Sequence, residues 1–150
     1  MMARRLTVAL ALALLLAGCV SPPPRSPSAP GPSKGPAGTS WIVTGILDRQ
    51  AVTSPIPGTE LTVEFGTDGT VRGSAGCNGY AGPYTVTDGA ISVGPLAHQE
   101  MGCVSPEGIM EQEAAFFAAF ESASTIERQP ALLILRTPEG GTALILTVKS

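Results

Sequence analysis

The sequence predicts an α+β fold in which one helix packs on a curved, mainly antiparallel β-sheet that forms a partial barrel. Three observations lead to this prediction. Short segments of alternating or continuous apolar residues recur between residues 41 and 148, turn residues separate them, and one amphipathic helical segment interrupts them. We place this single domain at residues 40–150, a length suited to one hydrophobic core.

The first hairpin is predicted from the parity of its side chains. A half-buried strand is predicted at residues 59–65, because polar and apolar side chains alternate from Glu60 to Phe65. A three-residue loop at 67–69, with Gly69 in the left-handed region, sets Phe65 opposite Val71. We prefer this loop because it keeps apolar side chains on one face.

The second hairpin needs only a two-residue loop. Asp88-Gly89 is a typical turn pair, and this loop sets Val86 opposite Ile91. Further strands are predicted at residues 41–47, 125–128, 131–136 and 142–148. The last two are apolar on both faces, so we expect them to be central and covered on each side.

One helix is predicted, with Ser105 as the N-cap, Pro106 in the first helical position and residues 109–123 as its body. One broad arc of this helix carries Ile109, Met110, Phe116, Phe117, Phe120 and Ala123. Glu113 lies in the middle of that arc, where a carboxylate needs hydrogen bonds or a charged partner. We favour hydrogen bonds to backbone N–H groups of the glycine-rich segment 73–82. A proton-handling or ligand-binding role is the alternative.

Residues 1–18 are predicted to be a lipoprotein signal peptide that is removed. Their apolar run is shorter than the roughly 20 residues that cross a bilayer. The sequence Leu16-Ala17-Gly18-Cys19 resembles a lipobox, which implies a lipid on the Cys19 sulfur and a membrane anchor. Residues 19–39 would form the lipidated cysteine and a Pro/Ser/Gly-rich tether.

These features predict a lipid-anchored protein of the bacterial cell envelope. Val20, rather than Asp, follows Cys19. This favours the periplasmic side of the outer membrane in a cell with two membranes; a cell with one membrane would carry the protein on its surface. The domain has five basic and twelve acidic side chains, a net charge of −7. Such a domain repels phosphates, so we expect no nucleic acid partner.

Cys77 and Cys103 remain as a pair once Cys19 is assigned to lipid, and we predict a disulfide between them. A catalytic or metal-binding thiol is less favoured, since the chain has no Cys-x-x-Cys spacing and one histidine. That histidine, His98, lies two residues from Glu100 and could form a metal site or an acid–base pair. We favour an exposed or hydrogen-bonded His98, and we expect no metal and no cofactor.

Three blocks together resemble the META (HslJ-like) domain. They are Gly76-Cys77-Asn78-Gly79-Tyr80-Ala81-Gly82-Pro83-Tyr84, Met101-Gly102-Cys103, and Met110-Glu111-Gln112-Glu113 with Phe116 and Phe120. Gln99 departs from the family, in which Thr is frequent at this position. The resemblance implies antiparallel strands with one helix, in lipoproteins and secreted proteins linked to envelope stress and virulence. It does not imply an enzyme, and a binding or assembly role is the usual inference for such domains.

We therefore predict a non-catalytic binding or assembly module in envelope stress response or secretion, whose partner is an envelope protein or another envelope component. Asn78, Tyr80 and Glu113 are the candidate binding residues, and no catalytic residues are assigned. The alternative is a small-ligand binder with a pocket between sheet and helix, and an enzyme is the least favoured class. A filled core would favour the first function, and an open cavity between helix and sheet the second.

Overall fold

The computed structural model describes residues 35–149. The predicted signal peptide, Cys19 and most of the predicted tether lie outside these residues. Within them, no helix is both long enough and apolar enough to cross a membrane. The elements are β1 (Thr39–Asp48), β2 (Ala51–Thr53), β3 (Thr62–Phe65), β4 (Thr70–Ser74), β5 (Gly79–Thr87), β6 (Ala90–Val93), β7 (Ala97–His98), α1 (Ile109–Glu121), β8 (Thr125–Arg128), β9 (Leu132–Arg136) and β10 (Thr142–Val148).

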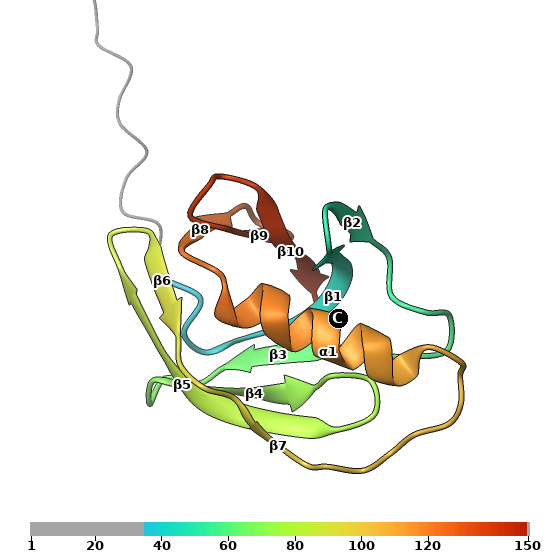
Figure 1. Cartoon of the computed structure of the whole chain (residues 1–150). Helices are drawn as coiled ribbons and strands as arrows, with labels where there is room; N and C mark the ends of the chain where they lie inside the picture. Colours follow the sequence, from blue (N-terminus) through green and yellow to red (C-terminus); the bar gives the residue numbers. More distant parts are fainter. Residues whose placement is uncertain (1–34, 150) are drawn as a thin grey trace, which may run out of the picture.

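Eight of the strands close into an antiparallel barrel (Figure 1). Their order around the barrel is β1, β3, β4, β5, β6, β8, β9 and β10, and β10 pairs again with β1. The predicted partial barrel was therefore wrong: the sheet is closed. Closure depends on the pairing of the first strand with the last, and local sequence patterns carry no information about that pairing.

Strand β1 closes the barrel because it pairs along both edges. Thr39–Ile42 pair with β3, and the stretch from Trp41 to Ile46 pairs with β10. The register with β10 shifts between Val43 and Gly45. At Gly45 a Cβ atom would lie 2.9 Å from Val52 Cγ1 and 3.2 Å from Ile145 Cβ, so glycine lets β2 and β10 approach the bend.

Both predicted hairpin registers are confirmed. Phe65 pairs with Val71, and Gly69 has a φ angle of 78°. Val86 pairs with Ile91 across the Asp88-Gly89 turn. The strand predicted at residues 59–65 is shorter than expected, because Leu61 forms only an isolated bridge before β3 begins.

Helix α1 packs mainly against β1, with further contacts to β10 and β6 (Figure 1). It fills the barrel with aromatic rings: the Phe120 ring lies 6.3 Å from the Phe65 ring, and the Phe116 ring lies 5.4 Å from the Tyr80 ring. All four side chains are buried. The interior of the barrel is thus filled with side chains.

The predicted start of the helix was wrong. The N-cap residue is Gly108, which has a φ angle of 83° and forms no side-chain cap, in place of Ser105. The carbonyl of Pro106 accepts a hydrogen bond of 3.2 Å from Ile109 N and closes a turn before the helix. Ser105 and Pro106 therefore belong to the preceding loop.

Strands β9 and β10 are covered on one face only, contrary to the prediction. Leu133, Leu135, Leu144 and Leu146 point into the barrel and are fully buried. Ile134 and Ile145 lie on the outer face and are only half-buried. A barrel has a single interior, and α1 packs its buried face against that interior and leaves the outer face of β9 and β10 uncovered.

Candidate functional site

A buried carboxylate and a buried amide meet between α1 and the turn before β5. The backbone N–H of Asn78 donates to Glu113 Oε2 over 2.8 Å, and Asn78 Nδ2 donates to Glu113 Oε1 over 2.6 Å. The two residues are 1% and 3% exposed. We call this pair the Asn78–Glu113 clamp. It confirms the prediction that Glu113 is buried and bonded to the backbone of the glycine-rich segment.

The clamp also holds the segment that precedes α1. Asn78 Nδ2 donates a second hydrogen bond, 3.1 Å long, to the carbonyl of Met101, and Asn78 Oδ1 accepts one of 3.0 Å from Met101 N. Both amide hydrogens of the Asn78 side chain thus have acceptors. Asn78 fixes a distant loop rather than its own turn, and both of its polar side-chain atoms are engaged.

A disulfide fastens the same two segments. Cys77 is bonded to Cys103, and their Cα atoms lie 6.0 Å apart, which confirms the predicted pairing. Cys103 N in turn donates to Met110 Sδ over 3.4 Å. Since Cys77 and Asn78 are neighbours, the covalent bond and the clamp act at adjacent points of the glycine-rich turn.

Residues 99–108, which we call the clamped loop, expose apolar side chains although they are fixed in this way. Met101 is 53% exposed and Val104 is 94% exposed. Glu100 and Glu107 lie on the same loop and are also exposed. The loop therefore presents apolar side chains flanked by negative charge.

Tyr80 is a structural part of the core. Its ring packs against Phe116 and Phe117, and its hydroxyl donates to the carbonyl of Thr62 over 2.8 Å. Burial raises the pKa of Tyr80 above its ordinary value, so the phenol stays protonated. Its binding role stays a prediction, and the contacts seen here are internal.

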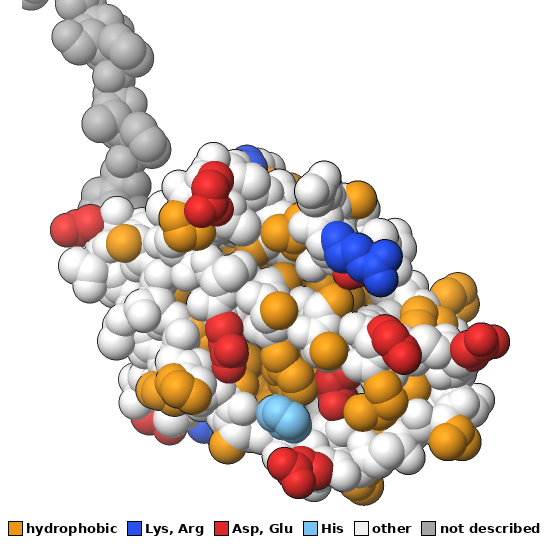
Figure 2. Space-filling model, in the orientation of Figure 1, with side chains coloured by type: hydrophobic (Ala, Val, Ile, Leu, Met, Phe, Trp, Pro, Cys, Tyr) orange, Lys and Arg blue, Asp and Glu red, His pale blue; other side chains and the backbone are white. Residues whose placement is uncertain are grey.

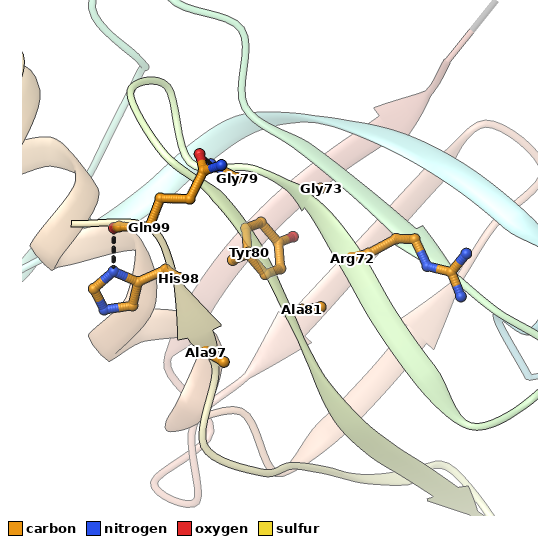
Figure 3. Close-up of a pocket in the computed structure, with 8 residues that line it drawn as sticks. All are labelled: Arg72, Gly73, Gly79, Tyr80, Ala81, Ala97, His98 and Gln99. Carbon is orange, nitrogen blue, oxygen red and sulfur yellow. Dashed lines mark hydrogen bonds between the residues drawn. The ribbon is translucent and has the colours of Figure 1, made fainter. Parts of the chain in front are cut away.

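Tyr80 also forms part of an open depression that includes Arg72, His98 and Gln99 (Figure 3). Gln99, at which the sequence departs from the family pattern, accepts a 3.3 Å hydrogen bond from Gly79 N through Oε1. The depression lies over β4, β5 and β7, and half of its lining residues are glycine or alanine.

His98 is exposed on the surface (Figure 2). Its ring stacks on Phe117 with a centroid distance of 4.6 Å, and Nδ1 lies 2.9 Å from the carbonyl of Gln99. Glu100 is exposed nearby in the chain. Among residues 35–149, no three His, Cys, Asp or Glu side chains form a group that could hold a metal ion.

Two polar residues that the sequence analysis missed connect α1 to the segment between β2 and β3 and to the segment between β6 and β7. Gln112 Oε1 accepts a 2.6 Å hydrogen bond from Ile56 N, and Glu121 Oε1 accepts one of 2.9 Å from Leu96 N. Gln112 was quoted only as part of a motif. Its position next to Glu113 on the helix is the one sequence feature that could have indicated a second hydrogen bond from α1 to a connecting segment.

Over residues 35–149, the fold and the site define a small closed β-barrel with one helix packed on its core and the clamped loop at the start of that helix. The family model of the META domain matches residues 36–150, and the chain belongs to this family. No curated protein gives a significant match.

Solved structures with similar folds include an NMR structure of a protein from Burkholderia xenovorans, with 25% sequence identity and a TM-score of 0.61. That match covers 87% of this chain and 98% of the other. A second NMR structure has 20% identity and a TM-score of 0.54, with coverage of 74% and 89%. The crystal structure of a DUF4847 family protein from Bacteroides vulgatus has 14% identity and a TM-score of 0.50, with coverage of 73% and 92%.

Proposed function

We propose that this protein is a lipid-anchored module of the bacterial cell envelope that acts by binding, in envelope stress response or secretion. The clamped loop is its contact surface. Membership of the META family supports an envelope-type protein. The lipid anchor rests on the sequence around Cys19.

One observation carries this proposal: Met101 and Val104 are exposed on a loop that is fixed at several points. Exposing apolar side chains is unfavourable in water, and a fixed loop cannot fold them inward. A preorganised loop loses little conformational entropy when it binds. Its acidic flanks fit a partner whose apolar contact surface is bordered by basic side chains.

Binding is favoured over catalysis because the best-placed reactive groups are engaged in the structure. Both carboxylate oxygens of Glu113 accept hydrogen bonds, and the Tyr80 hydroxyl donates to a backbone carbonyl. A nucleophile or general base needs a positioned partner and room for substrate. The disulfide also leaves no free thiol among residues 35–149.

The test is site-specific photo-crosslinking of the full chain in its host. A photoreactive residue at Val104 should give a discrete adduct with an envelope protein. The same group at Val148, an exposed apolar residue on β10, serves as the control. The adduct at position 104 should weaken when Cys77 and Cys103 are both replaced by Ser. The same adducts from positions 104 and 148, or none from position 104, would refute the proposed contact surface.

A further inference from the structure

A second recess lies between the first half of α1 and the hairpin formed by β1 and β2. Its volume is about 550 Å³, within the range of roughly 300–1,000 Å³ typical of small-molecule sites. Its apolar wall includes Ile46, Ile56 and Ala115. Its charged rim consists of Asp48, Arg49 and Glu111. The recess is separate from the exposed side chains of the clamped loop.

The wall of this recess is held in place. Gln112 Oε1 accepts a 2.6 Å hydrogen bond from Ile56 N, and Gln112 Nε2 donates to Thr59 Oγ1 over 3.2 Å. Both bonds fasten the connection between β2 and β3 to α1. A ligand would therefore enter a preformed site and would not need to order the connection first.

Arg49 has an unusual backbone at the edge of the recess. It lies in the two-residue turn between β1 and β2, with a φ angle of 57°. This conformation is costly for a residue with a Cβ atom, and glycine would adopt it freely. The two-residue hairpin turn requires it, and Asp88 adopts it in the turn between β5 and β6, with a φ angle of 50°. The long cationic side chain is thus placed at the rim at a cost in stability.

The charges on the rim are not paired with one another. The ion pairs among residues 35–149 are Asp68–Arg72, Glu127–Arg136 and Glu60–Lys149. Arg49, Asp48 and Glu111 take part in none of them and are all exposed. Arg49 belongs to the hairpin and Glu111 to the helix, so opposite charges come from the two sides of one recess.

We propose that this recess binds a small zwitterion with short aliphatic side chains, either a dipeptide with both termini free or a free amino acid. Arg49 would receive the carboxylate and Glu111 the ammonium group, and the aliphatic part would pack on Ile46 and Ile56. A simple anion would meet two carboxylates there, and a simple cation would meet the guanidinium. A ligand with both charges complements Arg49 and Glu111 at the same time. This inference does not depend on the proposed function.

The test titrates the full chain in detergent with alanyl-alanine, monitored by amide NMR shifts and calorimetry. Two analogues each remove one charge: N-acetyl-alanyl-alanine lacks the ammonium group, and alanyl-alanine amide lacks the carboxylate. Each analogue should bind roughly 10- to 100-fold more weakly, because a charge-assisted hydrogen bond is lost. A parallel titration with free alanine shows whether the recess prefers an amino acid or a dipeptide.

Protein variants assign each charge. Arg49→Gln should remove the preference for alanyl-alanine over its amide and keep the preference over the acetylated form. Glu111→Gln should do the reverse. Arg49→Gly should raise the unfolding temperature, since it relieves the backbone, and should still lose recognition of the carboxylate. Lys149→Gln makes the same change in charge away from the recess and should bind like the parent.

The proposal is overturned if alanyl-alanine and alanine cause no shifts at residues of the recess up to their solubility limits. It is equally overturned if the analogues bind as tightly as alanyl-alanine. Loss of binding in Lys149→Gln to the same extent as in Arg49→Gln would also overturn it, since net charge alone would then explain affinity.

Discussion

Replacing Glu113 with alanine should destabilise the domain by about 2–4 kcal/mol. The variant leaves two donors without acceptors: the backbone N–H of Asn78 and one hydrogen of its side-chain amide. Leaving a buried donor unpaired costs about 1–3 kcal/mol, and relief from burying a carboxylate offsets part of the sum. Asn78 is 1% exposed, so solvent does not replace the lost acceptors.

Glu113→Gln sharpens the test because it keeps the shape of the side chain. Each carboxylate oxygen of Glu113 accepts from a different nitrogen of Asn78. A glutamine has one oxygen and one NH₂ group, so in either orientation one donor faces another donor. We therefore expect a loss of about 1–3 kcal/mol even for this isosteric change. Glu111→Gln is the matched control, because Glu111 lies two residues earlier on the exposed side of α1. It should change stability by less than about 0.5 kcal/mol.

Urea unfolding monitored by fluorescence of the buried Trp41, with the disulfide intact, measures these differences. A second probe, far-ultraviolet circular dichroism, checks that the transition is two-state. If Glu113→Gln were as stable as the parent to within about 0.5 kcal/mol, the donors of Asn78 would have other acceptors. The reasoning about the clamp would then be refuted.

Two further predictions concern the barrel. Gly73→Ala should destabilise the domain by about 1–3 kcal/mol in urea unfolding, because the new Cβ would lie 2.0 Å from the carbonyl oxygen of Thr62. Gly102→Ala is the control and should be neutral, because the space around Gly102 is open. The hydrogen bond from Arg136 lowers the pKa of Glu127, so this pair adds stability above the ordinary carboxyl pKa, and the contribution disappears as the pH falls through the lowered value. Arg136→Leu should return the Glu127 pKa, followed by NMR titration, toward its ordinary value, and an unchanged pKa would contradict this cause.

The registers of both hairpins were predictable because they depend on local rules. Side chains alternate with a period of two, and the turn at Gly69 adds the one residue that keeps Phe65 opposite Val71. The burial of Glu113 was predictable for the same reason, since helical periodicity alone places it among the apolar side chains. Each of these inferences uses residues that are close in the sequence.

The errors and omissions involve contacts between distant segments. Closure of the barrel rests on β1 and β10, with Ile46 opposite Leu144. The two hydrogen bonds between Asn78 and Met101 span 23 residues, and no local pattern indicates them. The predicted helix start was wrong for a related reason. Ser105 and Pro106 favour a helix N-terminus locally, but they follow Cys103, which the disulfide to Cys77 holds, and they lie in the clamped loop.

The Asn78–Glu113 clamp lies beside a loop whose apolar side chains are not buried. A buried carboxylate is not a good source of stability, because an apolar side chain of similar size often serves as well or better. The clamped loop, however, leaves Met101 and Val104 exposed and so cannot be held by burying them in the core. Directional bonds are the remaining means of fixing such a segment, and Glu113, Asn78 and the disulfide supply them. The position of the buried charge is thus explained by the loop that it holds, rather than by the stability of the barrel.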